Sequence, residues 1–257
     1  MRLTVIGCAG SFPGPESAAS SYLVQADDET GRTWRILLDL GNGALGPLQR
    51  IIDPAELDAV LISHLHPDHF LDLCGLYVVL HYHPHPRIKR EAGLPVLTPD
   101  GGRARVSAAY GPDAADHLDD VLDLHTWSDK EAVTIGPFTV TPRRVEHPVE
   151  TFGFRVEDGE RVLAYSADTD SCQALIDLAR EADLLLAEAS FQEDRDEVRG
   201  IHLTGRRAGE AAADAGARRL VLTHIPVWTD AGVVLEEARS VFGGPVEVAR
   251  PGDVYDV

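Results

Sequence analysis

The sequence predicts an α/β protein in which two mixed β-sheets carry helices on their outer faces. Apolar runs are arranged as hairpins early and in the middle of the chain, whereas strands and helices alternate in its last third. No low-complexity linker and no repeat of about 20–50 residues interrupts the chain. We therefore expect a single domain that spans residues 1–257.

Short apolar runs bounded by turn residues define the elements of the first half. A Gly-, Ser- and Pro-rich loop at residues 7–21 either presents backbone N–H groups to a phosphate or simply connects two strands. The predicted elements are a strand at 3–6, hairpin strands at 21–25 and 35–40, a short helix ending near 52, a strand at 59–62, a buried helix at 70–80, a strand at 96–98 and one or two helices up to 129.

The second half gives clearer turn and capping signals. Asp158-Gly159 marks a hairpin turn, Thr204 is suited to the N-cap of an Ala-rich helix, and Gly216 follows the end of that helix. The predicted elements are strands at 133–135, 138–145, 152–156 and 161–165, a helix ending near 182, a strand at 183–187, the Ala-rich helix, a strand at 219–223, a helix at 231–242 and a strand at 246–248.

Four side chains of metal-ligand type lie at one predicted strand-to-helix junction. His64 and His66 are two residues apart in an extended segment, so both can point to the same side. Pro67 suits the first turn of a helix, which would present Asp68 and His69 from the helix start. One tetrahedral ion could not easily use four donors from so short a segment, which favours two metal ions that share them.

Further donors follow the predicted strand ends, where ligand sites form in layered α/β proteins. His147, Asp168 and His224 raise the total to seven, which suits two divalent ions with a bridging carboxylate. Asp170 is an alternative to Asp168, because only Thr169 separates the two carboxylates. Imidazole and carboxylate ligands fit zinc, manganese or iron.

A second group of histidines, His81, His83 and His85, also alternates along the chain. Two prolines and the basic residues that follow favour an exposed loop over a metal site.

Composition restricts the partners and the compartment. A net charge of −19 and a pI near 4.8 repel polyanions, so long nucleic acid is an unexpected partner. Three cysteines without a C-x-x-C pair fit a reduced, cytoplasmic setting. No apolar run approaches the ~20 residues needed to cross a bilayer, so we expect no membrane association.

The segment His64-Leu65-His66-Pro67-Asp68-His69 resembles the signature of the metallo-β-lactamase superfamily. The later His147, Asp168 and His224 resemble the remaining single-residue elements of that family in order and spacing, over essentially the whole chain. The resemblance implies an αββα sandwich and two divalent ions, most often zinc. It further implies one metal on His64, His66 and His147, a second on Asp68, His69 and His224, and a bridging Asp168.

Residues 188–191 and 202–204 resemble two motifs of the ribonuclease Z-like phosphodiesterase branch. This implies that Glu188 orients His202 and that His202 protonates the leaving oxygen, so Asp68, Glu188 and His202 are the expected catalytic residues. The whole pattern is most similar to actinobacterial atypical class II cyclic-nucleotide phosphodiesterases. It implies a homodimer that hydrolyses 3′,5′-cyclic nucleotides, cyclic AMP above all, by attack of a metal-bridging hydroxide.

The chain departs from the family pattern at two places. Ala167 stands where the family usually has Gly, a difference of one methyl group. Only about twenty residues separate His147 from Asp168, where ribonuclease Z carries a long tRNA-clamping arm. The alternatives are tRNA 3′ processing, hydrolysis of a carbon ester, thioester, lactone or lactam, and a catalytically silent metal-stabilised binding module.

Overall fold

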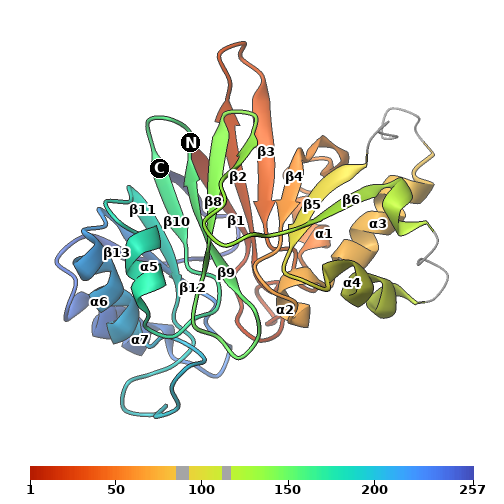
Figure 1. Cartoon of the computed structure of the whole chain (residues 1–257). Coiled ribbons are helices and arrows are strands. Elements are labelled where there is room, and N and C mark those ends of the chain that lie inside the picture. Colours follow the sequence, from red (N-terminus) through yellow and green to blue (C-terminus); the bar gives the residue numbers. More distant parts are fainter. Residues whose placement is uncertain (85–92, 112–116) are drawn as a thin grey trace.

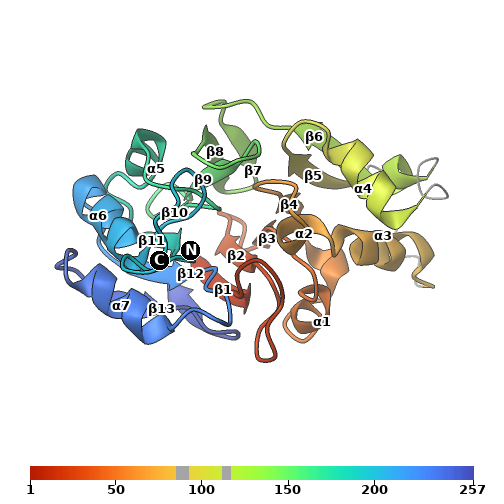
Figure 2. The ribbon, with the colours of Figure 1, turned by 90° about the horizontal axis from the view of Figure 1, so that it is seen from below.

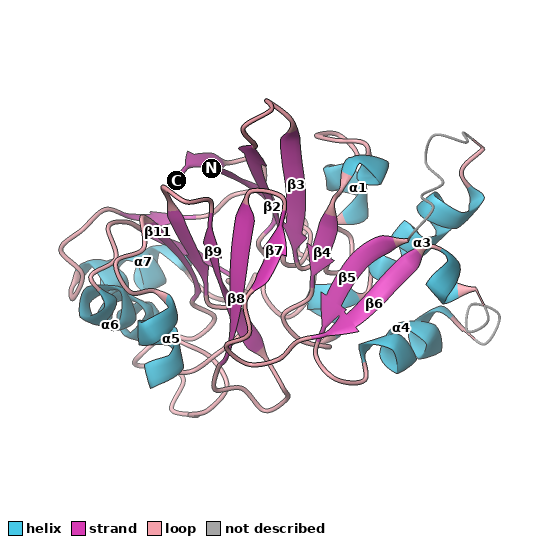
Figure 3. Ribbon diagram, turned by 45° about the horizontal axis from the view of Figure 1, so that its top comes forward, coloured by secondary structure: helices cyan, strands magenta, loops and turns pink. Residues whose placement is uncertain are grey.

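The computed structural model describes residues 1–84, 93–111 and 117–257, in which two seven-stranded sheets pack face to face (Figure 1). Helices cover the outer face of each sheet, as Figure 3 shows by their position on both flanks of the strands. This layered α/β arrangement confirms the predicted fold class.

The first sheet has the strand order β14-β1-β2-β3-β4-β5-β6. Pairs from β14 to β3 are antiparallel, and pairs from β3 to β6 are parallel. Consequently β1, β3 and β4 run in the same direction and end at the same edge. The strands are β1 (Arg2–Gly7), β2 (Ser21–Asp27), β3 (Thr33–Leu38), β4 (Ala59–Leu61), β5 (Leu94–Thr98), β6 (Leu122–Thr126) and β14 (Val254–Asp256).

The second sheet also has an antiparallel half and a parallel half, with the strand order β13-β12-β11-β10-β9-β8-β7. Pairs from β7 to β10 are antiparallel and pairs from β10 to β13 are parallel, so β8, β10, β11 and β12 end at one edge. The strands are β7 (Val133–Ile135), β8 (Phe138–Arg144), β9 (Phe152–Glu157), β10 (Val162–Tyr165), β11 (Leu184–Glu188), β12 (Leu220–Thr223) and β13 (Val246–Val248).

Three apolar clusters hold the layers together. One lies between the sheets and joins side chains such as Tyr22 and Ile36 of the first sheet to Phe154 and Leu186 of the second. The other two lie beneath the outer helices and bury the outer face of the central strands of each sheet. The helices are α1 (Leu45–Leu48), α2 (Pro67–Phe70), α3 (Leu73–Tyr82) and α4 (Gly102–Tyr110) on the first sheet, and α5 (Gln173–Leu178), α6 (Gly205–Ala215) and α7 (Ala231–Arg239) on the second (Figure 2).

The hairpins and caps agree with their sequence signals. Strands β2 and β3 pair antiparallel, as do β9 and β10. The Thr204 hydroxyl accepts a hydrogen bond from the Arg207 N–H, and Gly216 ends α6 at φ +66°. Two strands were not predicted: β6 lies in the segment expected to be helical, and β14 completes the first sheet beside β1.

The predicted helix at 70–80 is wrong in its continuity. The N–H of Asp72 donates to the Leu40 carbonyl at 3.1 Å, and its carboxylate accepts from the Leu45 N–H at 2.8 Å, so the chain breaks between α2 and α3. His81 lies in the last turn of α3 and not in an exposed loop, stacked on Tyr77. His83 follows that helix, and His85 lies outside the described residues.

Among the helices of residues 1–84, 93–111 and 117–257, none is long and apolar enough to cross a membrane.

Candidate metal centre

The two sheets bring seven predicted ligands to their shared strand-end edge. In the first sheet, β4 leads to His64 and His66, and α2 then presents Asp68 and His69. In the second sheet, the segments after β8, β10 and β12 supply three more donors from sequence positions far apart. The seven donors form two overlapping groups: His64, His66, His147 and Asp168, and Asp68, His69, Asp168 and His224.

The first group is a cluster of three imidazoles. His66 Nδ1 lies 2.9 Å from His64 Nε2 and 3.3 Å from His147 Nε2. The three ring nitrogens thus face a common point. Burial is the main cause that lowers the pKa of His64, His66 and His147, and each also lies beside other imidazoles. These rings are therefore neutral, which is the form that binds a metal ion.

The second group combines two imidazoles with a carboxylate. His224 Nε2 lies 3.2 Å from His69 Nε2 and 3.1 Å from Asp68 Oδ2. Burial alone would raise the pKa of Asp68, but His69 and His224 hold it well below its usual range. Asp68 is therefore ionised.

Asp168 lies between the groups, with one oxygen directed to each. Its Oδ2 is 3.6 Å from His64 Nε2, and its Oδ1 is 3.2 Å from His69 Nε2 and 3.4 Å from His224 Nε2. Oδ1 is buried and accepts no hydrogen bond of good geometry from any described residue. A buried carboxylate oxygen without a donor is costly unless a cation lies against it.

Asp170, the alternative to Asp168, is used differently. Its carboxylate accepts from Arg199 Nε at 2.7 Å and from Arg207 Nη1 at 3.1 Å, and it belongs to neither donor group. The geometry therefore favours Asp168 as the bridging ligand. The donor set, five imidazoles with two carboxylates, fits two divalent ions.

A buried carboxylate behind the centre, Asp39, fixes two of these side chains. Asp39 Oδ2 lies 2.8 Å from His69 Nδ1 and accepts from the Tyr165 hydroxyl at 2.8 Å and the Ser63 hydroxyl at 2.8 Å. The Ser63 hydroxyl also lies 3.1 Å from His64 Nδ1. Such outer contacts select which imidazole nitrogen faces the metal.

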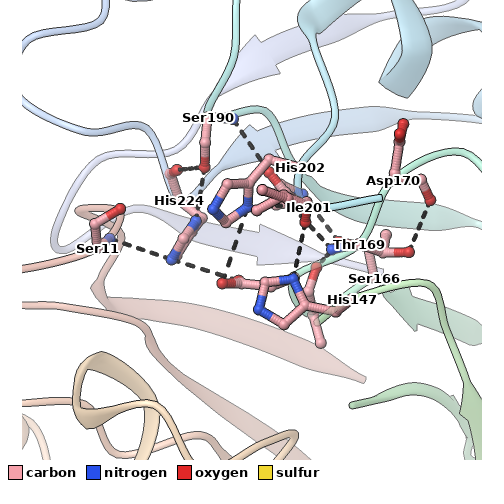
Figure 4. A network of polar contacts seen from close by, with 12 residues as sticks. Ser11, His147, Ser166, Thr169, Asp170, Ser190, Ile201, His202 and His224 are labelled. Carbon is pink, nitrogen blue, oxygen red and sulfur yellow. Dashed lines mark hydrogen bonds and ion pairs between the residues drawn. The ribbon is translucent and has the colours of Figure 1, made fainter. Parts of the chain in front are cut away.

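The remaining histidines have partners of the same kind. His147 Nδ1 donates to the Ile201 carbonyl at 2.8 Å, and Ser190 Oγ lies 2.8 Å from His224 Nδ1 (Figure 4). Asp39 and Ser190 were not predicted as site residues. Asp39 stands near the end of the strand predicted at 35–40, and Ser190 stands in the motif-like segment 188–191, but neither position by itself indicated a contact with a histidine ring.

His202 and Glu188 form a pair at the edge of the centre. His202 Nδ1 lies 2.8 Å from Glu188 Oε1, and the His202 ring centroid is 5.5 Å from those of both His147 and His224. Burial would lower the pKa of His202, but the Glu188 carboxylate, with Asp168, more than offsets this and raises it to about 9. His202 is thus protonated at neutral pH, and its side chain is 12% exposed.

The Gly-rich loop at 7–21 also reaches the centre. The Ser11 N–H points at His224 Nε2 from 3.3 Å, as Figure 4 shows. A Cβ at Gly10 would lie 2.3 Å from the His224 carbonyl oxygen, so only glycine allows this approach. Of the two interpretations of this loop, the geometry favours the one in which it faces the site.

Besides Ser11 of the Gly-rich loop (φ 65°), three strand-end residues at the site adopt left-handed backbone conformations. Asp39, Ala167 and His224 have φ values of 58°, 52° and 53°. Each such residue costs about 1–2 kcal/mol, and this strain is typical of functional sites. Ala167 therefore costs more, relative to glycine, than its single methyl group suggests.

Known proteins share this fold and sequence pattern. A family model described as Beta-lactamase superfamily domain matches residues 34–225. Uncharacterized protein Rv1339 of Mycobacterium tuberculosis is 44% identical over 261 residues, covering 100% of this chain and 92% of that protein.

Some relatives carry functional names. Probable metallo-hydrolase YhfI of Bacillus subtilis is 33% identical over 262 residues and 100% of both chains. Its crystal structure has a TM-score of 0.86 and 31% identity, covering 99% of this chain and 98% of that one. Ribonuclease Z of Myxococcus xanthus is 27% identical over 318 residues, covering 98% of this chain and 96% of that protein. The chain belongs to the metallo-β-lactamase superfamily of metallo-hydrolases.

Proposed function

We propose that the protein is a dinuclear-metal phosphodiesterase that hydrolyses 3′,5′-cyclic nucleotides, with cyclic AMP as the favoured substrate. The observation that carries this proposal is the His202–Glu188 pair. The pair lies beside the two donor groups that share Asp168 and belongs to neither of them. A carboxylic ester or lactone could be opened without such a pair, whereas a ribose alkoxide leaves poorly unless it is protonated.

The donor groups indicate which residues would hold each metal. His64, His66 and His147 would hold one ion, Asp68, His69 and His224 the other, and Asp168 would bridge them. We expect zinc, with manganese and iron as alternatives. Bound divalent ions neutralise phosphate charge and lower the pKa of a coordinated water molecule.

His202 would act as the general acid. The Glu188 carboxylate accepts a hydrogen bond from the Nδ1–H group, which leaves Nε2 to donate its proton to the departing ribose oxygen. Glu188 is buried and also accepts from the backbone N–H groups of Thr169 and Ser190, so the pair is fixed in orientation. Asp68 would have a second role in orienting the attacking water through its carboxylate.

The surface charge and the chain length favour a small substrate. The net charge of −19 opposes binding of long RNA, and the short span between His147 and Asp168 leaves no room for a tRNA-clamping arm there. We also expect a homodimer in the cytoplasm, where the three free cysteines would stay reduced.

A tRNA 3′-processing endonuclease is the second candidate. The 27% identity to a ribonuclease Z over nearly the full length of both chains favours it. A basic surface supplied by a partner would make this activity compatible with the acidic chain.

The deciding experiment measures turnover of cyclic AMP, cyclic GMP and an unprocessed tRNA by metal-loaded protein. Asp168→Ala should abolish cyclic-nucleotide turnover, and His202→Ala should lower kcat about 10²–10⁴-fold. His117→Ala is a matched control, because this exposed histidine contacts Asp120 and His81 and belongs to none of the donor groups. Cleavage of tRNA alone would overturn the proposal in favour of the second candidate. An unaffected His202→Ala variant would favour a carbon ester or thioester hydrolase.

A further inference from the structure

A partly exposed aromatic pair lies on the two segments that adjoin His224 of the candidate metal centre. The ring centroids of Phe12 and Trp228 are 4.8 Å apart with an interplanar angle of 43°. Trp228 is 62% exposed, and the neighbouring Val227 is 54% exposed. Single exposed apolar side chains are ordinary on a protein surface, but here the exposed Trp228 packs against the ring of the partly buried Phe12 and directly follows the exposed Val227.

Both aromatic residues belong to segments that contact His224. Phe12 directly follows Ser11, whose N–H lies 3.3 Å from His224 Nε2. Trp228 is four residues after His224 in the segment that pairs with the Gly-rich loop through the Ala9–Ile225 bridge. The two segments therefore form one wall of the site, and the aromatic pair stands on that wall.

Hydrogen bonds fix the turn that carries Trp228. The Thr229 N–H donates to the Pro226 carbonyl at 2.8 Å, and the Thr229 hydroxyl donates to the Ser190 carbonyl at 3.0 Å. Ser190 in turn contacts His224 Nδ1 at 2.8 Å. Trp228 and His224 thus share one anchor, so the backbone that carries the indole has a defined position relative to the candidate metal ligand.

The charge of the protein indicates what such a surface would bind. A chain of net charge −19 repels an anionic nucleotide at long range, so affinity must come from short-range contacts. A nucleobase is uncharged and aromatic, and its stacking on Trp or Phe does not depend on Coulomb attraction. The phosphate would be held at the metal centre, and the base would extend towards the rim.

We propose that Phe12 and Trp228 form a stacking platform for the base of the nucleotide substrate, an inference that rests on the proposed function. Every base has an aromatic face, so the platform selects nucleotides over base-free phosphodiesters without discriminating adenine from guanine.

The test compares cyclic AMP, cyclic GMP and a base-free ribose 3′,5′-cyclic phosphate as substrates. Trp228→Ala should raise KM about tenfold for both nucleotides, equivalent to about 1.4 kcal/mol, with kcat little changed. The base-free substrate should show no change, and Trp228→Phe should restore most of the loss. Tyr82→Ala is the matched control, since this tyrosine is 63% exposed at the end of α3.

Equilibrium binding of AMP and the sedimentation behaviour of each variant separate the remaining outcomes. The platform would be overturned if Trp228→Ala left the KM for cyclic AMP unchanged, or if it raised KM equally for all three substrates. Neither result would contradict the phosphodiesterase activity. AMP binding that depends on Trp228 without cyclic-nucleotide turnover would overturn the proposed function and keep the platform. Conversion of a dimer to a monomer by Trp228→Ala, with unchanged KM, would assign the patch to self-association and overturn the platform.

Discussion

At the scale of single residues, Asp39 shapes the candidate metal centre from behind. Its fully buried carboxylate accepts from the Ser63 N–H at 2.7 Å and lies 2.8 Å from His69 Nδ1. The tautomer that donates from Nδ1 leaves the Nε2 lone pair of His69 for a metal ion. Asp39 also tolerates a left-handed backbone, which turns its side chain inward after β3.

Replacing Asp39 by Asn should weaken metal binding without removing a ligand. The amide is a poorer acceptor for the His69 N–H, so we expect about 10–100-fold lower affinity for zinc, measured by competition with a chromogenic chelator. Asp28→Asn on the β2–β3 hairpin tip provides the control. Equal affinities of wild type and Asp39→Asn would contradict the role assigned to Asp39.

Asp170 predicts a pH dependence of stability. Burial would raise its pKa, but hydrogen bonds from Arg199, Gly200 and Ser171 keep the pKa below its ordinary value. Since the pKa is depressed in the folded state, the stabilisation is complete above about pH 4–5 and is lost as the pH falls through the folded-state value.

Asp170→Asn should therefore lower the free energy of unfolding by about 2 kcal/mol at pH 7, with the difference from wild type narrowing below pH 4. Urea unfolding at pH 7, 4 and 3, with a chelator present, measures both effects. Asp214→Asn on the exposed side of α6 should show no such difference. A difference that stays constant with pH would contradict the ion-pair explanation.

The sequence predicted the ligand side chains better than the residues that orient them. Four ligands lie within six consecutive positions, so their spacing alone predicts a common metal site; they are His64, His66, Asp68 and His69. The partner of His69, by contrast, lies 30 positions earlier and is recognisable only when β3 and β4 are side by side. Contacts of this kind depend on strand register, which no local pattern specifies.

At the scale of elements, helix α6 ends through a backbone conformation that favours glycine. Gly216 has φ +66°, and a Cβ there would meet no atom within 4 Å, so conformation alone sets the cost of substitution. Gly216→Ala should lower the free energy of unfolding by about 1 kcal/mol, measured by urea denaturation. Gly243→Ala, equally uncrowded but without a positive φ, should be neutral or slightly stabilising. Similar losses in both variants would refute this account.

The elements with local signals were predicted, and those that depend on tertiary pairing were not. Caps such as Thr204 and Gly216 act within one turn of the chain, so the sequence identifies them. Strand β14 is three residues long and two of them are exposed, so its pattern is too short to recognise before β1 is known to lie beside it. Only the first residue of strand β6 is buried, so this strand has no apolar run that would identify it in the sequence.

At the scale of the whole molecule, the candidate metal centre joins the two sheets. Four predicted ligands follow β4 of the first sheet, and three follow β8, β10 and β12 of the second. Asp168, from the second sheet, lies against His64 and His69 from the first as well as His224 from its own sheet, so its contacts span the interface. Bound ions would therefore connect the layers as well as serve the reaction.

Metal removal should consequently lower the stability of the entire fold. Binding to the folded state alone adds about 2.7 kcal/mol when free metal is a hundred times Kd, which corresponds to a Tm rise of about 5–10 °C for a chain of this size. Thermal unfolding of chelator-treated and zinc-reconstituted protein measures this rise. Asp168→Ala should abolish the rise in Tm. Asp170→Asn removes a carboxylate two residues along the chain and should retain the rise, because Asp170 belongs to neither donor group. Equal Tm values with and without metal would show that the seven donors do not form a metal site that joins the sheets.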